Sequence, residues 1–277
     1  IKSKGLYRET VNNDMKLILI PLKKFCKSTI EVSSLIEKLF LDKNFGRFVA
    51  AQTDFKEIPS VPIAYWLTKE MLSNFKRLPK LGTISDVLVG LQTGDNNRFI
   101  RSWSEVNLSS LKNQDNLDWR WVPYSKGGEF RKWYGNNDLV VDWLDDGIHI
   151  IQHPSAVIRN RDRYFKNGIT YTNLSSGSFS ARMKDDNGIF DQKGSMFFLQ
   201  DERETPGLLS LLLSKACSKI LEIICPTMDF NPGSLVNLPV PSEYRQSSIV
   251  KVAQVAIGLS RFDWNSQESS MGFIRIP

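Results

Sequence analysis

Polar side chains suited to contacting a nucleic acid gather first in a loop that follows a strand-like apolar run, Val87-Leu88-Val89. Two glycines, Gly90 and Gly94, allow the backbone to turn tightly there or to adopt a positive φ. Amide, hydroxyl and guanidinium groups hydrogen-bond base edges and phosphates. A hairpin that joins this run to Arg98-Phe99-Ile100 explains the same pattern, so both interpretations stay open. The candidate residues are Gln92, Thr93, Asn96, Asn97 and Arg98.

Two later segments repeat the combination of glycine and polar side chains. Lys132 follows the glycine pair Gly127-Gly128, and a third polar set follows Gly177. In the major groove, Arg and Lys pair with guanine, whereas Ser and backbone amides suit phosphates. Arg182 is therefore the candidate base contact of the third set, and core packing is expected for Trp133 and Phe179. The additional DNA-binding candidates are Lys132, Ser178, Ser180, Arg182 and Lys184.

The chain shows no catalytic or metal-binding constellation. Its two histidines, His149 and His153, have the i,i+4 spacing of helical metal ligands, but Pro154 interrupts the segment, so no metal site is predicted. The sequence contains no phosphate-binding P-loop, nucleophile elbow or dinucleotide-binding motif. The acid pairs Asp145-Asp146 and Asp185-Asp186 stand beside Gly or Asn and are explained as turns. No catalytic residue is predicted.

Charge is distributed unevenly. Residues 1–80 carry 15 Lys and Arg against 8 Asp and Glu, whereas residues 81–277 carry 21 against 22, a net charge of −1. Within the second part, residues 147–184 contain six basic side chains and one acid. Such clustering is typical of a phosphate-contacting surface, and a solvated face explains it equally well. Phosphate contact or plain solvent exposure is expected for Arg159, Arg161 and Arg163.

The composition is that of a soluble globular protein. The 277 residues are 41% hydrophobic and 24% charged, enough for one large or two smaller domains. No apolar run approaches the ~18 residues of a membrane helix. Cys26, Cys217 and Cys225 form no C-x-x-C pair, which favours a reducing, cytoplasmic setting over a disulfide or zinc framework. Because the chain starts abruptly without Met, we expect a fragment of a longer protein.

The first 80 residues have a mixed α/β pattern. Strands are predicted at residues 17–20 and 47–51, and a capping box at Ser28-Thr29-Ile30-Glu31 predicts a helix that continues to Phe40. A proline-rich turn at residues 58–62 and a basic linker at residues 76–80 indicate a domain boundary at about residue 80.

From Leu81 onward the pattern is strand-rich, with helices toward the C-terminal end. Strands are predicted at residues 139–141 and 196–199, with turns at residues 145–147 and 185–188. One helix is predicted from Thr205 to Pro226, with Thr205 as N-cap, Pro206 at its first position and Cys217 on its apolar face, so Cys217 is a core residue. A final helix is predicted from about Ser242. Its apolar face contains Ile249, Val252, Ala253, Ala256 and Ile257.

Five blocks of the chain resemble, in the same order, segments of large adenine-specific DNA methyltransferases. That family includes the methyltransferases of BREX phage-exclusion systems and the methylase–specificity fusions of type II restriction-modification. The blocks are spread over residues 55–239. They are FKEIPSVPIAYW (55–66), GLQTGDNNRF (90–99), KWYGN (132–136), YTNLSSGSFSAR (171–182) and PTMDFNPG (226–233).

The resemblance implies an α+β fold in which separate parts of the chain have separate functions. Residues 81–258 would form a strand-rich DNA target-recognition domain with flanking helices. Residues 1–80 would be the α/β C-terminal tail of the methyltransferase domain and its linker, and residues 259–277 a C-terminal extension. The implied partners are double-stranded DNA and the missing methyltransferase domain in cis, with no membrane.

The resemblance also implies the reaction of the parent enzyme, in which S-adenosylmethionine methylates adenine N6. The family's catalytic motif is Asn/Asp-Pro-Pro-aromatic, which holds the flipped base. The nearest string here, Phe230-Asn231-Pro232-Gly233, lacks the second proline and the aromatic residue, and a glycine-rich cofactor loop is missing. This chain is therefore expected to bind no cofactor and not to methylate alone.

Two other functions stay open. A stand-alone specificity subunit of a type I restriction system would carry two recognition halves joined by long helices, and one half is visible. A protein-interaction module without DNA binding is compatible with the net charge of −1 over residues 81–277. Steep salt dependence of duplex affinity would identify a DNA-binding protein.

Overall fold

The computed structural model describes residues 5–11, 14–20, 37–38, 41–42, 45, 48–51, 58, 67–112, 119–175, 177–227 and 229–273. It divides the chain into two compact units, Ile1–Leu78 and Pro79–Pro277. The mixture of helices and strands confirms the predicted α+β class. Within the described residues, no helix has the length and apolar character needed to cross a lipid bilayer.

The first unit contains an antiparallel sheet with the strand order β1-β2-β3, formed by Gly5–Val11, Asp14–Ile20 and Phe48–Ala51. The last two strands confirm the predictions at residues 17–20 and 47–51. Helix α3 (Lys69–Arg77) begins after Thr68, whose side chain accepts a hydrogen bond from the Met71 N–H at 3.2 Å. The predicted capping box and most of the proline-rich turn lie outside the described residues.

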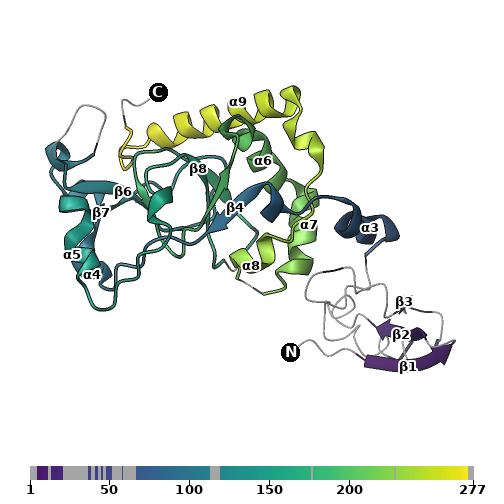
Figure 1. Ribbon diagram of the computed structural model, residues 1–277. Coiled ribbons are helices and arrows are strands. Elements are labelled where there is room, and N and C mark those ends of the chain that lie inside the picture. The colour runs from purple at the N-terminus through teal and green to yellow at the C-terminus, as the bar shows by residue number, and fades with distance from the viewer. Residues whose placement is uncertain are drawn as a thin grey trace. The chain divides into compact units, whose positions relative to one another are not determined.

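The second unit is built on two four-stranded sheets, with the strand orders β10-β6-β7-β5 and β4-β11-β8-β9 (Figure 1). Apart from the parallel pair β10–β6, the strand pairs in both sheets are antiparallel. Strands β7 and β11 confirm the predictions at residues 139–141 and 196–199. The strands are β4 (Ser85–Leu88), β5 (Ile100–Ser102), β6 (Trp121–Ser125), β7 (Leu139–Asp142), β8 (Gly168–Tyr171), β9 (Ala181–Lys184), β10 (Ile189–Phe190) and β11 (Met196–Leu199).

The hairpin considered for the first polar loop does not form. Strand β4 pairs with β11 and β5 pairs with β7, so the two runs that flank the loop belong to different sheets. The Asp95 side chain accepts a hydrogen bond from the Arg98 N–H at 3.0 Å and starts a helical turn, α4 (Asn96–Phe99). This local cap replaces the second strand up to Phe99.

One hydrophobic cluster joins the two sheets. Val122 and Val141 come from one sheet, and Met196 and Phe198 come from the other. Tyr164 makes edge-to-face ring contacts with both Trp143 and Phe190, at centroid distances of 5.5 and 5.7 Å. Because both sheets contribute to this core, the loops at their ends are fixed relative to one another.

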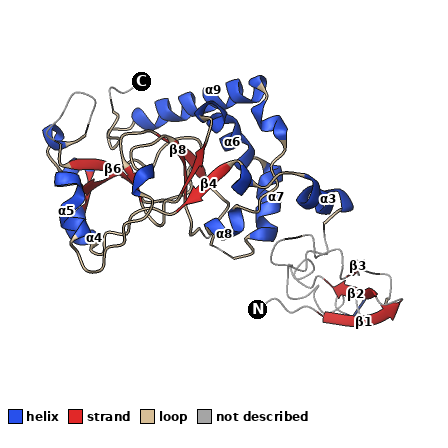
Figure 2. Ribbon diagram, in the orientation of Figure 1, coloured by secondary structure: helices blue, strands red, loops and turns tan. Residues whose placement is uncertain are grey.

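Helices gather at both ends of the second unit (Figures 1 and 2). Helices α6, α7 and α8 lie beside the sheet that contains β4 and β8, whereas α4 and α5 lie beside the sheet that contains β6 and β7. The remaining helices are α5 (Ile148–Ile151), α6 (Thr205–Leu212), α7 (Lys215–Ile224), α8 (Pro232–Leu235) and α9 (Ser247–Asn265). Short 3₁₀ helices span Leu81–Thr83, Trp103–Glu105, Leu108–Ser110, Leu144–Gly147, Arg161–Arg163, Glu202–Glu204 and Ser242–Arg245.

Two helix predictions need correction. The single helix from Thr205 to Pro226 is two helices, because the Ser214 side chain accepts a hydrogen bond from the Cys217 N–H at 3.1 Å and caps a new one. Cys217 itself is buried as predicted, and burial raises the pKa of its thiol to about 12. In the final helix, Ala253 is buried, but Val252 is 70% exposed because α9 turns that side away from the core.

Candidate functional site

Loops from both sheets meet at the buried carboxylate of Asp191, which directly follows β10. The Tyr124 hydroxyl lies 2.6 Å from Asp191 Oδ2 and 3.0 Å from the Leu91 carbonyl oxygen, so its single proton is directed at this pair. The backbone N–H of Lys193 donates to Asp191 Oδ1 at 2.6 Å, and Lys126 Nζ lies 3.4 Å from Oδ2. Burial and the nearby carboxylate raise the pKa of Tyr124, which keeps it a donor.

A further loop joins this centre through its backbone. Asn173 donates from its N–H to the Lys193 carbonyl at 3.1 Å and from its side-chain amide to the Gln192 carbonyl at 3.0 Å. Gly127 has a φ of +83°, and a Cβ there would lie 2.9 Å from the Lys193 carbonyl oxygen, so glycine is required. Residues 91–93, 125–132, 172–175, 177–180 and 191–195 together are called the Asp191 loop cluster.

Arg182 lies inside this cluster rather than on its surface. Its side chain is 0% exposed. One terminal nitrogen donates to the Gly127 carbonyl at 3.1 Å and to the Thr172 hydroxyl at 3.2 Å. The other donates to the Arg131 carbonyl and the Ser180 hydroxyl, both at 3.3 Å. Burial, together with repulsion from Arg131, lowers the pKa of the guanidinium to about 10. In this structure Arg182 fastens two loops and offers no surface to a base.

Three more predicted DNA contacts are buried. Thr93 donates to the Asn96 side-chain oxygen at 2.9 Å, Ser180 belongs to the Arg182 interactions, and Lys184 lines a separate pocket. Their polar groups form hydrogen bonds within the protein, because buried polar groups require hydrogen-bond partners. The predicted residues that retain exposed or partly exposed surface are Gln92, Asn96, Asn97, Arg98, Lys132 and Ser178.

The exposed candidates do not form one continuous group. The backbone N–H of Gln92 donates to the Val157 carbonyl, and the N–H of Val157 donates back to the Gln92 carbonyl. A Cβ on Gly94 would lie 2.5 Å from the His153 ring. The α4 turn that carries Asn96, Asn97 and Arg98 therefore lies near α5, and Figure 1 shows the two short helices side by side. Lys132, in contrast, lies next to Arg182, since Trp133 bridges to that residue.

The structure adds residues to the candidate site that the sequence patterns missed. Lys193 is exposed and forms no ion pair with any described residue. Lys126 is partly exposed and reaches Asp191, while the 56% exposed ring of Phe130 lies 5.6 Å from the Lys132 ammonium group. Each of the first two lysines stands beside a glycine that allows close backbone approach, Gly127 or Gly194. In the sequence, a lysine directly before a glycine was the pattern that could have identified Lys126 and Lys193 as candidates.

The basic segment after residue 158 has a structural role. Arg161 pairs with Asp146, and Arg163 lies 2.6 Å from Asp86, so both guanidinium groups tie the segment to other parts of the unit. Arg161 is exposed, as expected, and Arg163 is partly exposed. Among the described residues, no group of three or more His, Cys, Asp or Glu side chains could hold a metal ion.

The string that most resembles a methyltransferase motif starts a helix. The Asn231 side chain accepts a hydrogen bond from the Ser234 N–H at 2.9 Å and caps α8, with Pro232 at its first position. The Asn231 carboxamide oxygen is therefore engaged by the backbone of its own segment.

Sequence comparison identifies two similar proteins, while no family model matches the chain. The chain is 37% identical over 225 residues to adenine-specific methyltransferase BrxX of Escherichia coli O9:H4 (strain HS), covering 80% of this chain and 18% of that protein. It is 38% identical over 235 residues to adenine-specific methyltransferase PglX of Lacticaseibacillus casei (strain Zhang), covering 80% of this chain and 20% of that protein. The expected resemblance to adenine-specific methyltransferases is confirmed. The chain spans about a fifth of the length of the curated relatives it matches.

Proposed function

We propose that this chain is the DNA target-recognition segment of an adenine-specific DNA methyltransferase. Residues 81–258 contact the duplex, and residues 1–80 are the end of the methyltransferase domain and its linker. S-adenosylmethionine and the target adenine are bound by the rest of the parent enzyme. The similarity to about a fifth of each of two adenine-specific methyltransferases supports a role within such an enzyme.

The observation that carries the proposal is the Asp191 loop cluster. Its exposed edge presents Gln92, Lys126, Lys193 and neighbouring polar groups on loops that Asp191 and Arg182 hold from beneath. A surface that selects a DNA sequence must keep its side chains in a fixed geometry before the duplex arrives. Buried hydrogen bonds from both sheets provide that rigidity, and exposed loop positions provide the contacts.

The exposed side chains divide into two chemical groups. The ammonium groups of Lys126, Lys132 and Lys193 suit phosphates, as does the Ser178 hydroxyl, and these contacts position the duplex. Side-chain amides pair bidentately with adenine in the major groove, so Gln92 and Gln192 suit base contacts. Phe130 and Leu174, which are 56% and 58% exposed, suit apolar contact with the thymine methyl group.

Methylation patterns in a full-length enzyme that carries this segment test the proposal. Gln92→Ala should change which adenines are methylated, because it removes a base contact, while S-adenosylmethionine binding stays unchanged. Lys193→Ala should lower methylation at all sites evenly, because phosphate contacts carry no sequence information. Lys219→Ala is the matched control, since Lys219 is exposed on α7 and its ion-pair partner is Glu222 of the same helix. Identical methylation maps and rates for all three variants would remove the loop cluster from DNA recognition.

A further inference from the structure

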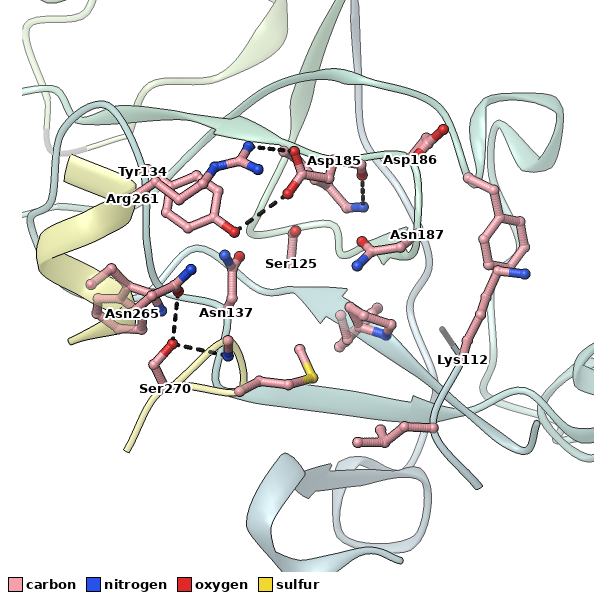
Figure 3. Close-up of a pocket in the computed structure, with 18 of the residues that line it drawn as sticks. Lys112, Ser125, Tyr134, Asn137, Asp185, Asp186, Asn187, Arg261, Asn265 and Ser270 are labelled. Carbon is pink, nitrogen blue, oxygen red and sulfur yellow. Dashed lines mark hydrogen bonds and ion pairs between the residues drawn. The ribbon is translucent and has the colours of Figure 1, made fainter. Parts of the chain in front are cut away.

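A pocket of about 960 Å³ lies beside β6. Its wall combines Tyr124 and Ser125 of β6, residues 184–187 after β9, the C-terminal end of α9 and residues 270–272. The volume falls in the range of small-molecule binding sites and is far larger than an isolated anion requires. Figure 3 shows how the polar side chains lie in it.

Neutral polar side chains surround one part of the pocket. Ser125, Asn137 and Asn187 come from three separate segments and lie around the same space in Figure 3. Each asparagine amide offers both a donor and an acceptor, the combination that recognises the hydrogen-bonding edge of a nucleobase. Trp264 also lines the pocket, and its indole nitrogen is buried without a hydrogen-bond acceptor among the described residues.

Two ammonium groups remain available to an anion. Arg261 pairs with Asp185 at 2.7 Å, so these two charges compensate each other. Lys184 is 4% exposed, and its ammonium group donates to the Asp185 carbonyl oxygen at 2.9 Å, a neutral acceptor. Lys112 forms no ion pair with a described residue. One carboxylate on the wall, that of the exposed Asp186, opposes these two cations, which leaves a surplus of positive charge.

Aromatic rings form another part of the wall. The Lys112 ammonium group lies 4.4 Å from the centre of the Trp119 ring and 5.1 Å from that of Phe165. Phe165 has a φ of 56°, which bulky residues rarely adopt, and its N–H donates to the Gly188 carbonyl at 3.0 Å. Strained backbone of this kind concentrates at binding sites. Here it keeps the Phe165 ring beside the Lys112 ammonium group.

We propose that this pocket binds a nucleotide, with the base at Asn137 and Asn187 and the phosphate at Lys112 and Lys184. The pocket shares Tyr124 and Ser125 with the support of the Asp191 loop cluster, but its wall does not include the exposed residues Gln92, Lys126 and Lys193. Two sources can present the same chemistry, a free mononucleotide and a nucleotide unit extruded from DNA. Either nucleotide would be bound by hydrogen bonds to the edge of its base, by an aromatic ring beside the base and by a cation beside its phosphate.

Isothermal titration of the 277-residue chain tests the proposal with defined probes. The four deoxynucleoside monophosphates are compared with the matching nucleosides and with inorganic phosphate. At least one monophosphate should bind, and its nucleoside and inorganic phosphate should each bind about tenfold more weakly, because each retains half of the contacts. The second arm compares a plain duplex with the same duplex carrying one unpaired nucleotide. A preference for the unpaired nucleotide identifies DNA as the source, and binding of the monophosphate alone identifies the free compound.

Variants place the ligand in this pocket. Lys112→Met should weaken monophosphate binding about tenfold and leave nucleoside binding unchanged, because it removes a charged contact to phosphate. Asn187→Ala, in an exposed turn, should weaken both. Lys251→Met on the exposed side of α9 is the matched control and should change neither. Circular dichroism confirms that each variant is folded. The proposal is overturned if no monophosphate and no unpaired nucleotide binds at millimolar concentration, or if Lys112→Met and Asn187→Ala both leave binding unchanged.

Discussion

The interior and the exposed edge of the Asp191 loop cluster contain the same kinds of residue in different circumstances. Arg182 and Lys193 are both cations on segments with polar neighbours and a nearby glycine. Arg182 is 0% exposed and makes four hydrogen bonds to its own loops, whereas Lys193 is exposed and has no described ion-pair partner. Residue type therefore indicates that a polar site exists. Burial decides which polar residues support the loops from inside and which are exposed to a binding partner.

The largest expected effect is on the interior. Arg182→Ala leaves two carbonyl oxygens without their donor and opens a cavity, so it should lower the free energy of unfolding by about 4 kcal/mol. Urea unfolding measures this change. Arg182→Lys should restore little of it, since one ammonium group cannot reach four acceptors on two loops. A stable Arg182→Ala protein with altered DNA site choice would instead return Arg182 to the exposed edge.

The next effect concerns Lys184, a buried cation on β9, the strand that also carries Arg182. Its ammonium group has one described hydrogen-bond acceptor, the Asp185 carbonyl oxygen. Burial lowers its pKa to about 8 from an ordinary 10.5, with Asp185 and Asp186 acting in the opposite direction. Between these pH values the unfolded chain binds the proton more tightly, so the folded state should gain up to about 3 kcal/mol as pH rises through that window.

The comparison with Lys184→Met isolates this contribution from those of other titrating groups. The difference in unfolding free energy between the native chain and the variant should grow in favour of the native chain from pH 8 to 10.5. Chemical denaturation at several pH values provides the measurement. A difference that does not change with pH would show that Lys184 is solvated in the folded state.

A smaller effect is expected at the hydrogen-bonding centre itself. Asp191→Ala removes the acceptor of the Tyr124 hydroxyl and of the Lys193 N–H, so it should destabilise the chain by about 2 kcal/mol. Tyr124→Phe should cost about 1 kcal/mol, and the double variant should cost less than the sum because both changes remove the same hydrogen bond. Additive effects in this cycle would show that the two side chains act independently.

The smallest effect on stability is expected at the exposed edge. Lys193→Ala and Gln92→Ala should each change the free energy of unfolding by less than about 0.5 kcal/mol, as is usual for surface substitutions. The same urea experiment measures them beside Arg182→Ala. A loss comparable to that of Arg182→Ala would place either residue among the interior supports.

Local patterns predicted much of the second unit. The strands at residues 139–141 and 196–199 were predictable because apolar runs end at turn residues, and Cys217 was predictable as core from helical spacing. Local capping explains two errors. Asp95 and Ser214 each accept a backbone N–H three residues later, which starts a helical turn where a strand or a continuous helix was expected.

The site was less predictable than the fold. Nothing around Arg182 in the sequence distinguishes a base contact from a buried support, because its partners at Gly127, Arg131 and Thr172 lie on other segments. Val252 shows the same limit on α9, where helical spacing identifies a face and the neighbouring elements decide whether that face is covered. Long-range contacts, which a single sequence does not reveal, made these decisions.

Duplex binding as a function of salt concentration tests whether the exposed edge of the Asp191 loop cluster binds DNA. If the exposed edge of the Asp191 loop cluster contacts phosphates, the affinity of the 277-residue chain for duplex DNA falls steeply with salt. The double variant Lys126→Ala and Lys193→Ala should reduce the slope of log affinity against log salt by about 2, and Lys219→Ala should leave it unchanged. No duplex binding at low salt, or the same slope in the double variant, would show that this edge does not bind DNA.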